Sequence, residues 1–177
     1  MRSAALLVGT ALACIAAVGA ALVSQHMFDM QPCPWCVLQR VIYLAIALAC
    51  LIGLAWRGTL GRRSGALLGM LLADCGIAAA LWQHFQAAAS ASCNLTLADK
   101  IVGRWLQLDS LLPDVFSARA SCADAAVNLL GVPYDFWSLT LFVLVSAALL
   151  VVVLRPGRRP SPSYSARRAT PALRARA

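Results

Sequence analysis

The stretch Cys33-Pro34-Trp35-Cys36-Val37-Leu38-Gln39-Arg40 lies where a short polar loop meets the start of a long apolar segment. The two thiols of a Cys-x-x-Cys pair can close a disulfide across a tight turn, and Pro34 stiffens that turn. A helix that begins near Cys36 favours a thiolate at its N-terminus, and Arg40 follows at i+4 on the same helical face. An arginine just inside a bilayer is costly and usually has a polar or anionic partner. The stretch therefore predicts a redox-active dithiol beside a site for an anionic, membrane-soluble molecule.

The composition of the chain indicates an integral membrane protein of one domain. Of its 177 residues, 61% are hydrophobic and only 12% are charged, which does not fit a soluble domain with one large core. Cys14, Cys50 and Cys75 lie within long apolar runs, whereas the other four cysteines lie outside them. This distribution excludes a small secreted disulfide scaffold, and we expect the three to act as small buried hydrophobes.

Four apolar runs are long enough to cross a bilayer as helices, at about 1.5 Å per residue across ~30 Å. The predicted spans are residues 4–23, 37–56, 66–85 and 136–154. Two outer loops fall at about 24–36 and 86–135. The sequence predicts an all-α membrane protein, a four-transmembrane-helix bundle over residues 1–154. A cleaved signal peptide is the rival interpretation of the first run, but that run is long for one.

Positive charge is distributed unevenly between the two predicted sides. One side holds the cations of the N-terminus, the turn between spans two and three, and the tail (Arg2, Arg57, Arg62, Arg63, Arg155, Arg158, Arg159, Arg167, Arg168, Arg174, Arg176), and no acidic residue accompanies them. This positive-inside pattern predicts that both termini are cytoplasmic. The tail at 155–177 is basic and lacks apolar periodicity. It is predicted to be disordered and to contact anionic lipid. It has no interleaved aromatics or fold motif for nucleic acid.

The long outer loop carries an apolar stripe of its own. Its members recur at near-helical spacing (Ile101, Val102, Trp105, Leu106, Leu108, Leu111, Leu112, Val115, Phe116). A short helix on the membrane surface, bounded by Pro113, explains the stripe, and so does a small helix packed on the loop itself. Both interpretations stay open at this point.

Cys93 and Cys122 lie in the same loop, in small polar surroundings. They fit a structural disulfide that closes the loop, and equally an exchangeable disulfide that passes oxidising equivalents to Cys33 and Cys36. A four-thiolate zinc site would need all four, but Cys93 and Cys122 do not form a second close pair, so we expect no metal.

Two further polar residues fall in or near the third span. Asp74 lies inside it, and we favour a residue that is neutralised or hydrogen-bonded to a neighbouring helix over a proton path. His84 lies close to its outer end and could face Arg40 across the bundle. An interfacial anchor is the alternative for His84.

Taken in order, these features make the chain similar to the disulfide bond formation protein B (DsbB) family of bacterial inner-membrane thiol oxidases. The resemblance extends through Leu154 and rests on Gln25-His26, Cys33-x-x-Cys36 followed by Arg40, His84, Cys93, Cys122 and Leu130-Gly131-x-Pro133. The chain departs from the family pattern at Gln39, where some members carry an acid, in the inter-cysteine pair Pro34-Trp35, and at Asp74.

The resemblance implies a disulfide-generating thiol:quinone oxidoreductase in the bacterial inner membrane. Cys93 and Cys122 would oxidise a periplasmic thioredoxin-fold oxidase, DsbA, with Cys93 forming the mixed disulfide. Exchange through Cys33 and Cys122 would then pass the electrons to Cys33 and Cys36, and Cys36 would deliver them to ubiquinone or menaquinone. The four cysteines are the implied catalytic residues, while Arg40 and His84 are assigned to the quinone pocket.

Three other functions share some of these sequence features. A reductant exporter should carry a membrane-embedded cysteine pair, and Cys14, Cys50 and Cys75 offer no obvious one. A non-enzymatic scaffold would keep Cys33 and Cys36 inert towards quinone. A vitamin K epoxide reductase-like protein places its Cys-x-x-Cys late in the span order, whereas here the motif opens the second span.

Overall fold

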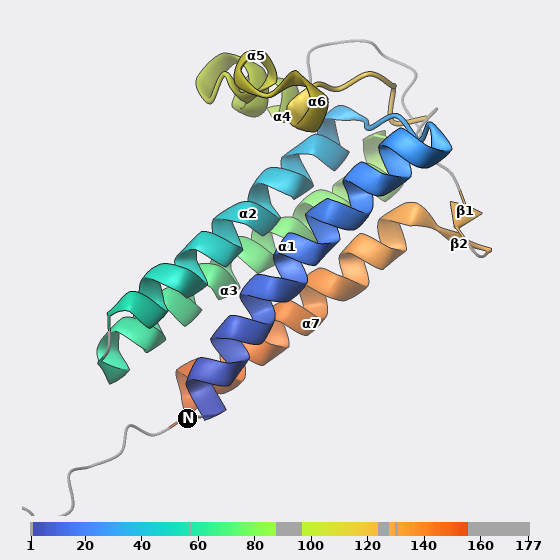
Figure 1. Ribbon diagram of the computed structural model, residues 1–177. Coiled ribbons are helices and arrows are strands. Elements are labelled where there is room, and N and C mark those ends of the chain that lie inside the picture. Colours follow the sequence, from blue (N-terminus) through green and yellow to red (C-terminus); the bar gives the residue numbers. More distant parts are fainter. Residues whose placement is uncertain (1, 57, 88–96, 124–127, 130, 156–177) are drawn as a thin grey trace, which may run out of the picture.

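Four long helices run alongside one another in the computed structural model, which describes residues 2–56, 58–87, 97–123, 128–129 and 131–155. They are α1 (Arg2–Phe28), α2 (Pro34–Ala55), α3 (Thr59–Trp82) and α7 (Tyr134–Leu154) (Figure 1). All four are long and apolar enough to cross a membrane, α3 being continued to Phe85. The prediction of an all-α membrane protein built on a four-helix bundle is confirmed.

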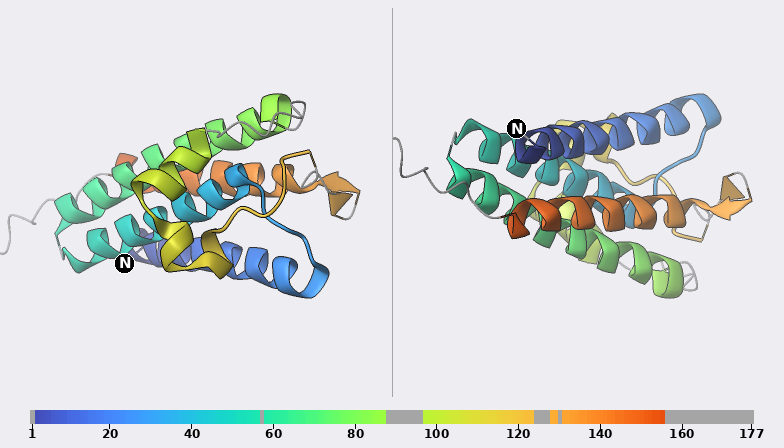
Figure 2. Two further views of the ribbon diagram at one scale, coloured as in Figure 1. Left: turned by 90° about the horizontal axis from the view of Figure 1, so that it is seen from above. Right: turned by 90° about the horizontal axis from the view of Figure 1, so that it is seen from below.

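The long helices run side by side along the bundle (Figure 2). Helix α1 contacts α2, α2 contacts α3, α3 contacts α7, and α7 contacts α1. Small residues permit the close approaches. A Cβ atom added to Gly65 of α3 would lie 2.7 Å from the Ala49 carbonyl oxygen of α2, and one added to Gly76 would collide with the Phe142 ring of α7. Phe142 in turn stacks on Tyr43 of α2, with ring centroids 4.1 Å apart. Three helices therefore meet around one aromatic pair.

Large apolar side chains cover the outside of the bundle as well as its interior. Leu12, Leu48, Leu68 and Leu144, one from each long helix, are all more than half exposed. A helix that is apolar all round belongs in a large core or in lipid, and these outward leucines have no protein neighbours to bury them. The surface of the bundle is therefore suited to hydrocarbon.

Helix α2 begins at the dithiol. Cys33 is its N-cap residue, with extended backbone angles, and its sulfur accepts a hydrogen bond of 3.3 Å from the Cys36 amide. Pro34 occupies the first turn, where its fixed φ fits a helix and its missing N–H costs nothing. The Cys-Pro-x-Cys sequence thus starts the helix and places both sulfurs in its first turn.

Short helical segments lie across one end of the bundle, above the start of α2 (Figure 1). They are α4 (Leu97–Asp99), the π-helical η2 (Lys100–Trp105), α5 (Leu108–Leu111) and α6 (Pro113–Phe116). We call this end the loop end. It also holds η1 (Gln83–Ala87), a π-helical turn that continues α3, and the antiparallel strands β1 (Asn128–Leu129) and β2 (Val132–Pro133) before α7.

The surface helix predicted for the loop is present as several pieces. The helix is interrupted at Gln107, whose φ of 50° is left-handed, and again at Leu112, which precedes the first-turn proline of α6. Val102 and Phe116 are buried, whereas Trp105 remains 79% exposed and Leu112 55%. The segments thus pack on α2 and also leave apolar side chains exposed. Contact of these side chains with the membrane surface stays a prediction.

Asp74 is hydrogen-bonded to a neighbouring helix, as predicted. The Ser146 hydroxyl of α7 donates to its carboxylate over 2.7 Å.

Candidate functional site

Three sulfurs meet at the loop end of the bundle. The sulfurs of Cys33 and Cys36 lie 2.7 Å apart, and the Cys33 thiol also donates a hydrogen bond to Cys122. Cys33 is fully buried and Cys122 is 9% exposed. A thiol that contacts two others can form a disulfide with either, so this arrangement is suited to thiol-disulfide exchange.

Main-chain hydrogen bonds bring Cys122 to this position. The Arg119 and Ala120 amides both donate to the Pro32 carbonyl, over 3.0 and 3.3 Å. Pro32 directly precedes Cys33, and Ala120 lies two residues before Cys122. The segment after α6 is thereby held against the loop before α2, and the two cysteines are neighbours although they are far apart in the chain.

The hydrogen bond between Cys33 and Cys122 affects the two thiols in opposite ways. Cys33 donates it, so this bond, the contact with Cys36 and burial all raise the pKa of Cys33. Cys122 accepts it, and that bond holds the pKa of Cys122 below its ordinary value despite burial. Cys122 is therefore the better thiolate and Cys33 the protonated partner.

Arg40 lies one helical turn beyond Cys36, and its side chain is buried. Its Nη1 donates to the Gln25 Oε1 of α1 and to the Val115 carbonyl of α6, each over 2.8 Å. Gln25 is itself fixed, because its amide nitrogen donates to the Asp114 carbonyl over 3.1 Å. Within the described part of the chain, Arg40 forms no ion pair. Neutral oxygens orient this cation and leave its charge available to an electron-rich ligand.

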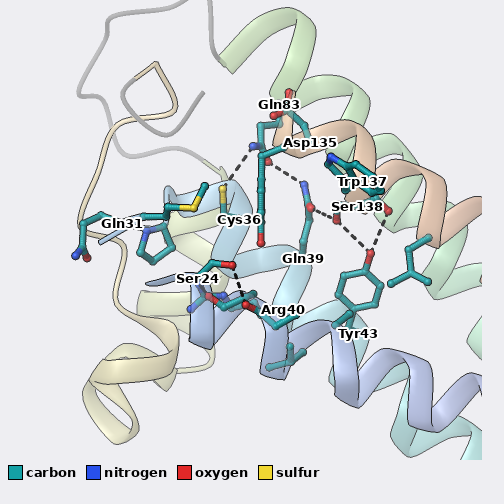
Figure 3. A pocket seen from close by; sticks show the side chains of 18 residues that line it. Ser24, Gln31, Cys36, Gln39, Arg40, Tyr43, Gln83, Asp135, Trp137 and Ser138 are labelled. Carbon is teal, nitrogen blue, oxygen red and sulfur yellow. Dashed lines mark hydrogen bonds between the residues drawn. The ribbon is translucent and has the colours of Figure 1, made fainter. Parts of the chain in front are cut away.

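A cavity of about 250 Å³ opens between α1, α2 and α7 at this level, beside Gln83 of η1 (Figure 3). Cys36 and Arg40 both line it, together with a polar set (Gln39, Tyr43, Gln83, Asp135, Ser138) and small or apolar residues (Ala17, Val18, Ala20, Ala21, Met30, Pro32, Trp137, Leu141). Ligand sites for small apolar molecules combine such walls with a few placed polar groups. The donor set fits a planar, membrane-soluble molecule that carries electron-rich oxygens.

His84 lies beside the cavity and does not line it. Its Nδ1 is 2.9 Å from the Asp135 carboxylate, and its ring packs edge-on against Phe85 and Phe136. Asp135 does line the cavity. The structure therefore brings Arg40 and Cys36 together at the cavity and connects His84 to it through one carboxylate.

Cys93, the remaining predicted site residue, lies outside the described residues. Sequence reasoning also missed several side chains at the site: Gln25, Gln39, Tyr43, Gln83 and Ser138. Gln39 and Gln83 carried a usable signal, because an uncharged amide within a membrane-spanning run must find hydrogen-bond partners inside the protein. Tyr43 and Ser138 carried none, since either residue is ordinary in such a run.

Comparison with known proteins agrees with this geometry. The family model for disulfide bond formation protein DsbB matches residues 2–152. A disulfide bond formation protein B from Pseudomonas syringae pv. tomato is 35% identical over 150 residues, which cover 83% of this chain and 87% of that protein. One from Herminiimonas arsenicoxydans is 31% identical, covering 84% and 94%. The match spans all four long helices, and the chain therefore belongs to the DsbB family of disulfide bond formation proteins.

Proposed function

We propose that this chain is a thiol:quinone oxidoreductase that reoxidises a periplasmic DsbA-like dithiol oxidase and passes the electrons to a membrane quinone. One observation carries the proposal: Cys33 contacts both Cys122 and Cys36, and Cys36 lines a cavity that Arg40 also lines. A continuous thiol path thus leads from the loop to a cavity within the membrane-spanning bundle.

The first half of the reaction is disulfide exchange. A thiolate of the reduced partner attacks the Cys93–Cys122 disulfide at Cys93, which forms a mixed disulfide and releases Cys122 as a thiolate. The second thiolate of the partner then attacks the mixed disulfide, so the partner leaves oxidised and Cys93 is released. Cys122 attacks Cys33 of a Cys33–Cys36 disulfide, which forms a Cys33–Cys122 bond and frees Cys36. Cys93 then attacks Cys122 of that bond, which restores the Cys93–Cys122 disulfide, frees Cys33 and leaves Cys33 and Cys36 as the dithiol. Each step breaks one S–S bond and forms one.

The second half of the reaction takes place at the cavity. Ubiquinone or menaquinone, when bound, accepts two electrons and two protons and leaves as the quinol. Cys36 presents its sulfur to the cavity, and Arg40 supplies positive charge beside it. The guanidinium, held by Gln25 and the Val115 carbonyl, is already oriented before any ligand arrives.

His84 belongs to the same proposal as a residue of the quinone pocket. It acts through Asp135, the carboxylate that separates it from the cavity.

The orientation of the chain in the inner membrane is also proposed. The dithiol end faces the periplasm and both termini face the cytoplasm. Arg62 and Arg63 begin α3 at the opposite end from Cys33, and Arg63 donates to the carbonyl of Arg155 where α7 ends. Basic residues gathered at one end of a bundle favour the cytoplasmic side.

The test is a reconstituted reaction. Purified protein in nanodiscs is mixed with a reduced DsbA-like protein and a soluble ubiquinone or menaquinone analogue, and quinone reduction is followed by its ultraviolet absorbance. We expect reduction that depends on the partner and is lost in Cys36→Ala. Cys75→Ala, which removes an exposed cysteine of α3, is the matched control and should remain active. A protein whose Cys33 and Cys36 stay in one redox state throughout, by thiol trapping, would be a scaffold and not an oxidase.

A further inference from the structure

A chain of hydrogen bonds crosses the cavity wall and ends on the Cys36 sulfur (Figure 3). The Tyr43 hydroxyl bonds to the Ser138 carbonyl over 3.0 Å, and the Ser138 hydroxyl donates to Gln39 Oε1 over 2.5 Å. Gln39 Nε2 donates to Gln83 Oε1 over 2.8 Å, and Gln83 Nε2 donates to Cys36 Sγ over 3.4 Å. Polar groups from α2, α7 and the junction of α3 with η1 thus converge on one sulfur.

The order of the bonds determines which end of Gln83 faces the sulfur. A primary amide has one acceptor atom and one donor atom. Because Gln39 donates to the Gln83 oxygen, the Gln83 nitrogen is the end left to face Cys36. The oxygen of Gln39 is occupied in the same way by the Ser138 hydroxyl. Ser138 and Gln39 therefore orient an N–H donor onto Cys36.

Burial makes this chain of hydrogen bonds costly to disturb. Gln39 is 5% exposed and Gln83 4%, and a buried amide that loses its partner pays the full desolvation cost of the unpaired group. Gln83 also begins the π-helical turn η1. Such turns are often found at functional sites, because they change the direction of side chains along a helix.

We propose that Gln83 is a positioning residue for Cys36: its N–H holds the sulfur towards the cavity and stabilises negative charge on it, and Gln39 and Ser138 keep Gln83 in the donating orientation. This inference rests on the proposed function, in which the Cys36 thiolate is the electron donor to the quinone. The two electrons come from the Cys33/Cys36 dithiol, which becomes a disulfide. Gln83 itself gains and loses no atoms or electrons.

The proposal predicts the reactivity of Cys36 in the absence of quinone. Fully reduced protein in nanodiscs is treated with N-ethylmaleimide at fixed pH, and labelling of each cysteine is followed by mass spectrometry. Loss of one hydrogen bond to a charged group changes an equilibrium constant about tenfold, and here that constant sets the fraction of Cys36 present as thiolate. We expect Gln83→Leu to slow labelling of Cys36 about tenfold while labelling of Cys122 is unchanged. An unchanged Cys36 rate in Gln83→Leu overturns the proposal.

Two serines of α7 provide a matched pair. Ser138→Ala removes the bond that orients Gln39, and we expect it to slow Cys36 labelling about two- to threefold, because the Gln83 amide keeps its length and can still reach the sulfur. Ser146→Ala, in which the lost hydroxyl was bonded to Asp74, should leave the rate unchanged. Equal effects of the two serine substitutions on the rate of Cys36 labelling would overturn the role proposed for this chain of hydrogen bonds.

Quinone reduction separates this proposal from the proposed function. If Gln83 acts on the sulfur, Gln83→Leu should lower kcat and leave KM for the quinone unchanged. If the variant instead raises KM while the rate of Cys36 labelling is unchanged, Gln83 is a quinone ligand and the proposal is overturned. Gln83→Met, which keeps the length without a donor, replaces Gln83→Leu if that variant does not fold. A wild-type protein that reduces no quinone would refute the proposed function, whereas the labelling rates would still decide the role of Gln83.

Discussion

Arg40 of α2 donates a hydrogen bond of 2.8 Å to the main-chain carbonyl of Val115, in the short helix α6 of the loop. The same guanidinium lines the cavity within the bundle. One side chain therefore connects the loop that carries Cys122 with the cavity that Cys36 faces. A movement of α6 would change the hydrogen bonding of Arg40, so the state of the loop and the electrostatics of the cavity are coupled.

Arg40→Ala should weaken use of the quinone and leave exchange at the loop intact. Loss of the oriented cation removes a charged hydrogen-bond donor, so we expect the apparent KM for the quinone to rise about tenfold or more. Steady-state kinetics with varied quinone measures this, and mixed-disulfide formation with a DsbA-like partner tests the loop. Arg104→Ala, an exposed arginine of η2, is the control. An unchanged KM would refute the role of Arg40.

Gln25→Leu should loosen the loop. Gln25 accepts from Arg40 and donates to the Asp114 carbonyl, so its removal leaves a buried cation short of one acceptor and removes one of the hydrogen bonds that hold α6. We expect a cost of about 1–3 kcal/mol. Limited proteolysis of the 97–123 segment should become faster. Ser24→Ala, whose hydroxyl donates to the Ala20 carbonyl of α1 and not to α6, should be cleaved at the wild-type rate.

The pH dependence of Cys122 labelling should report its hydrogen bond from Cys33. Because that bond lowers the pKa of Cys122, its thiolate persists below the ordinary midpoint of about 8.5, and labelling falls only as the pH drops through the lowered pKa. In Cys33→Ala the donor is absent, and we expect the midpoint to move upward. Identical Cys122 midpoints in the wild type and the variant would contradict the prediction.

Gly76→Val should destabilise the bundle. Its Cβ would occupy the space of the Phe142 ring, and overpacking of this kind costs about 1–3 kcal/mol. Thermal unfolding in detergent should show a lower midpoint. Gly9→Val in α1 is the matched control, because no atom lies within 4 Å of a Cβ there. Similar midpoints for the two variants would show that α3 and α7 can separate without cost.

Trp105 and Leu112 should contact lipid. Both are largely exposed on the loop segments although they are apolar, which favours burial in the membrane interface. Spin labels at these positions should be shielded from water-soluble relaxation agents, whereas a label at Asp109, on the same segments, should remain accessible. Labels at 105 and 112 that report bulk water would exclude this contact.

The bundle itself was predictable because its signal is simple. Four long apolar runs, positive charge at one end and a helix start at Cys33-Pro34 require only composition and local geometry, and each long helix lies on its predicted run. The break-up of the loop helix at Gln107 was not predictable. A left-handed glutamine has no local signature, and it is tolerated because Val102 and Phe116 are held by packing on α2.

The candidate site was likewise predictable only in part. Cys36 and Arg40 were expected to be close because i and i+4 share a helical face, and both line one cavity. For His84 the sequence left two possibilities open, a position facing Arg40 and an interfacial anchor, because the rotation of neighbouring helices decides which residues meet. In the structure its neighbour is Asp135. Gln83 and Ser138 reach the site through packing between helices, which one sequence does not specify.

The Pro32 carbonyl accepts two main-chain bonds from the segment that leads to Cys122. Only a short tether remains between those bonds and the sulfur, at roughly 3.5 Å per residue. Cys122 and Cys33 therefore collide as if each were present at a very high local concentration, and their reaction is effectively unimolecular. Its rate should be independent of how dilute the protein is, and it should fall when the tether is lengthened by inserted glycines.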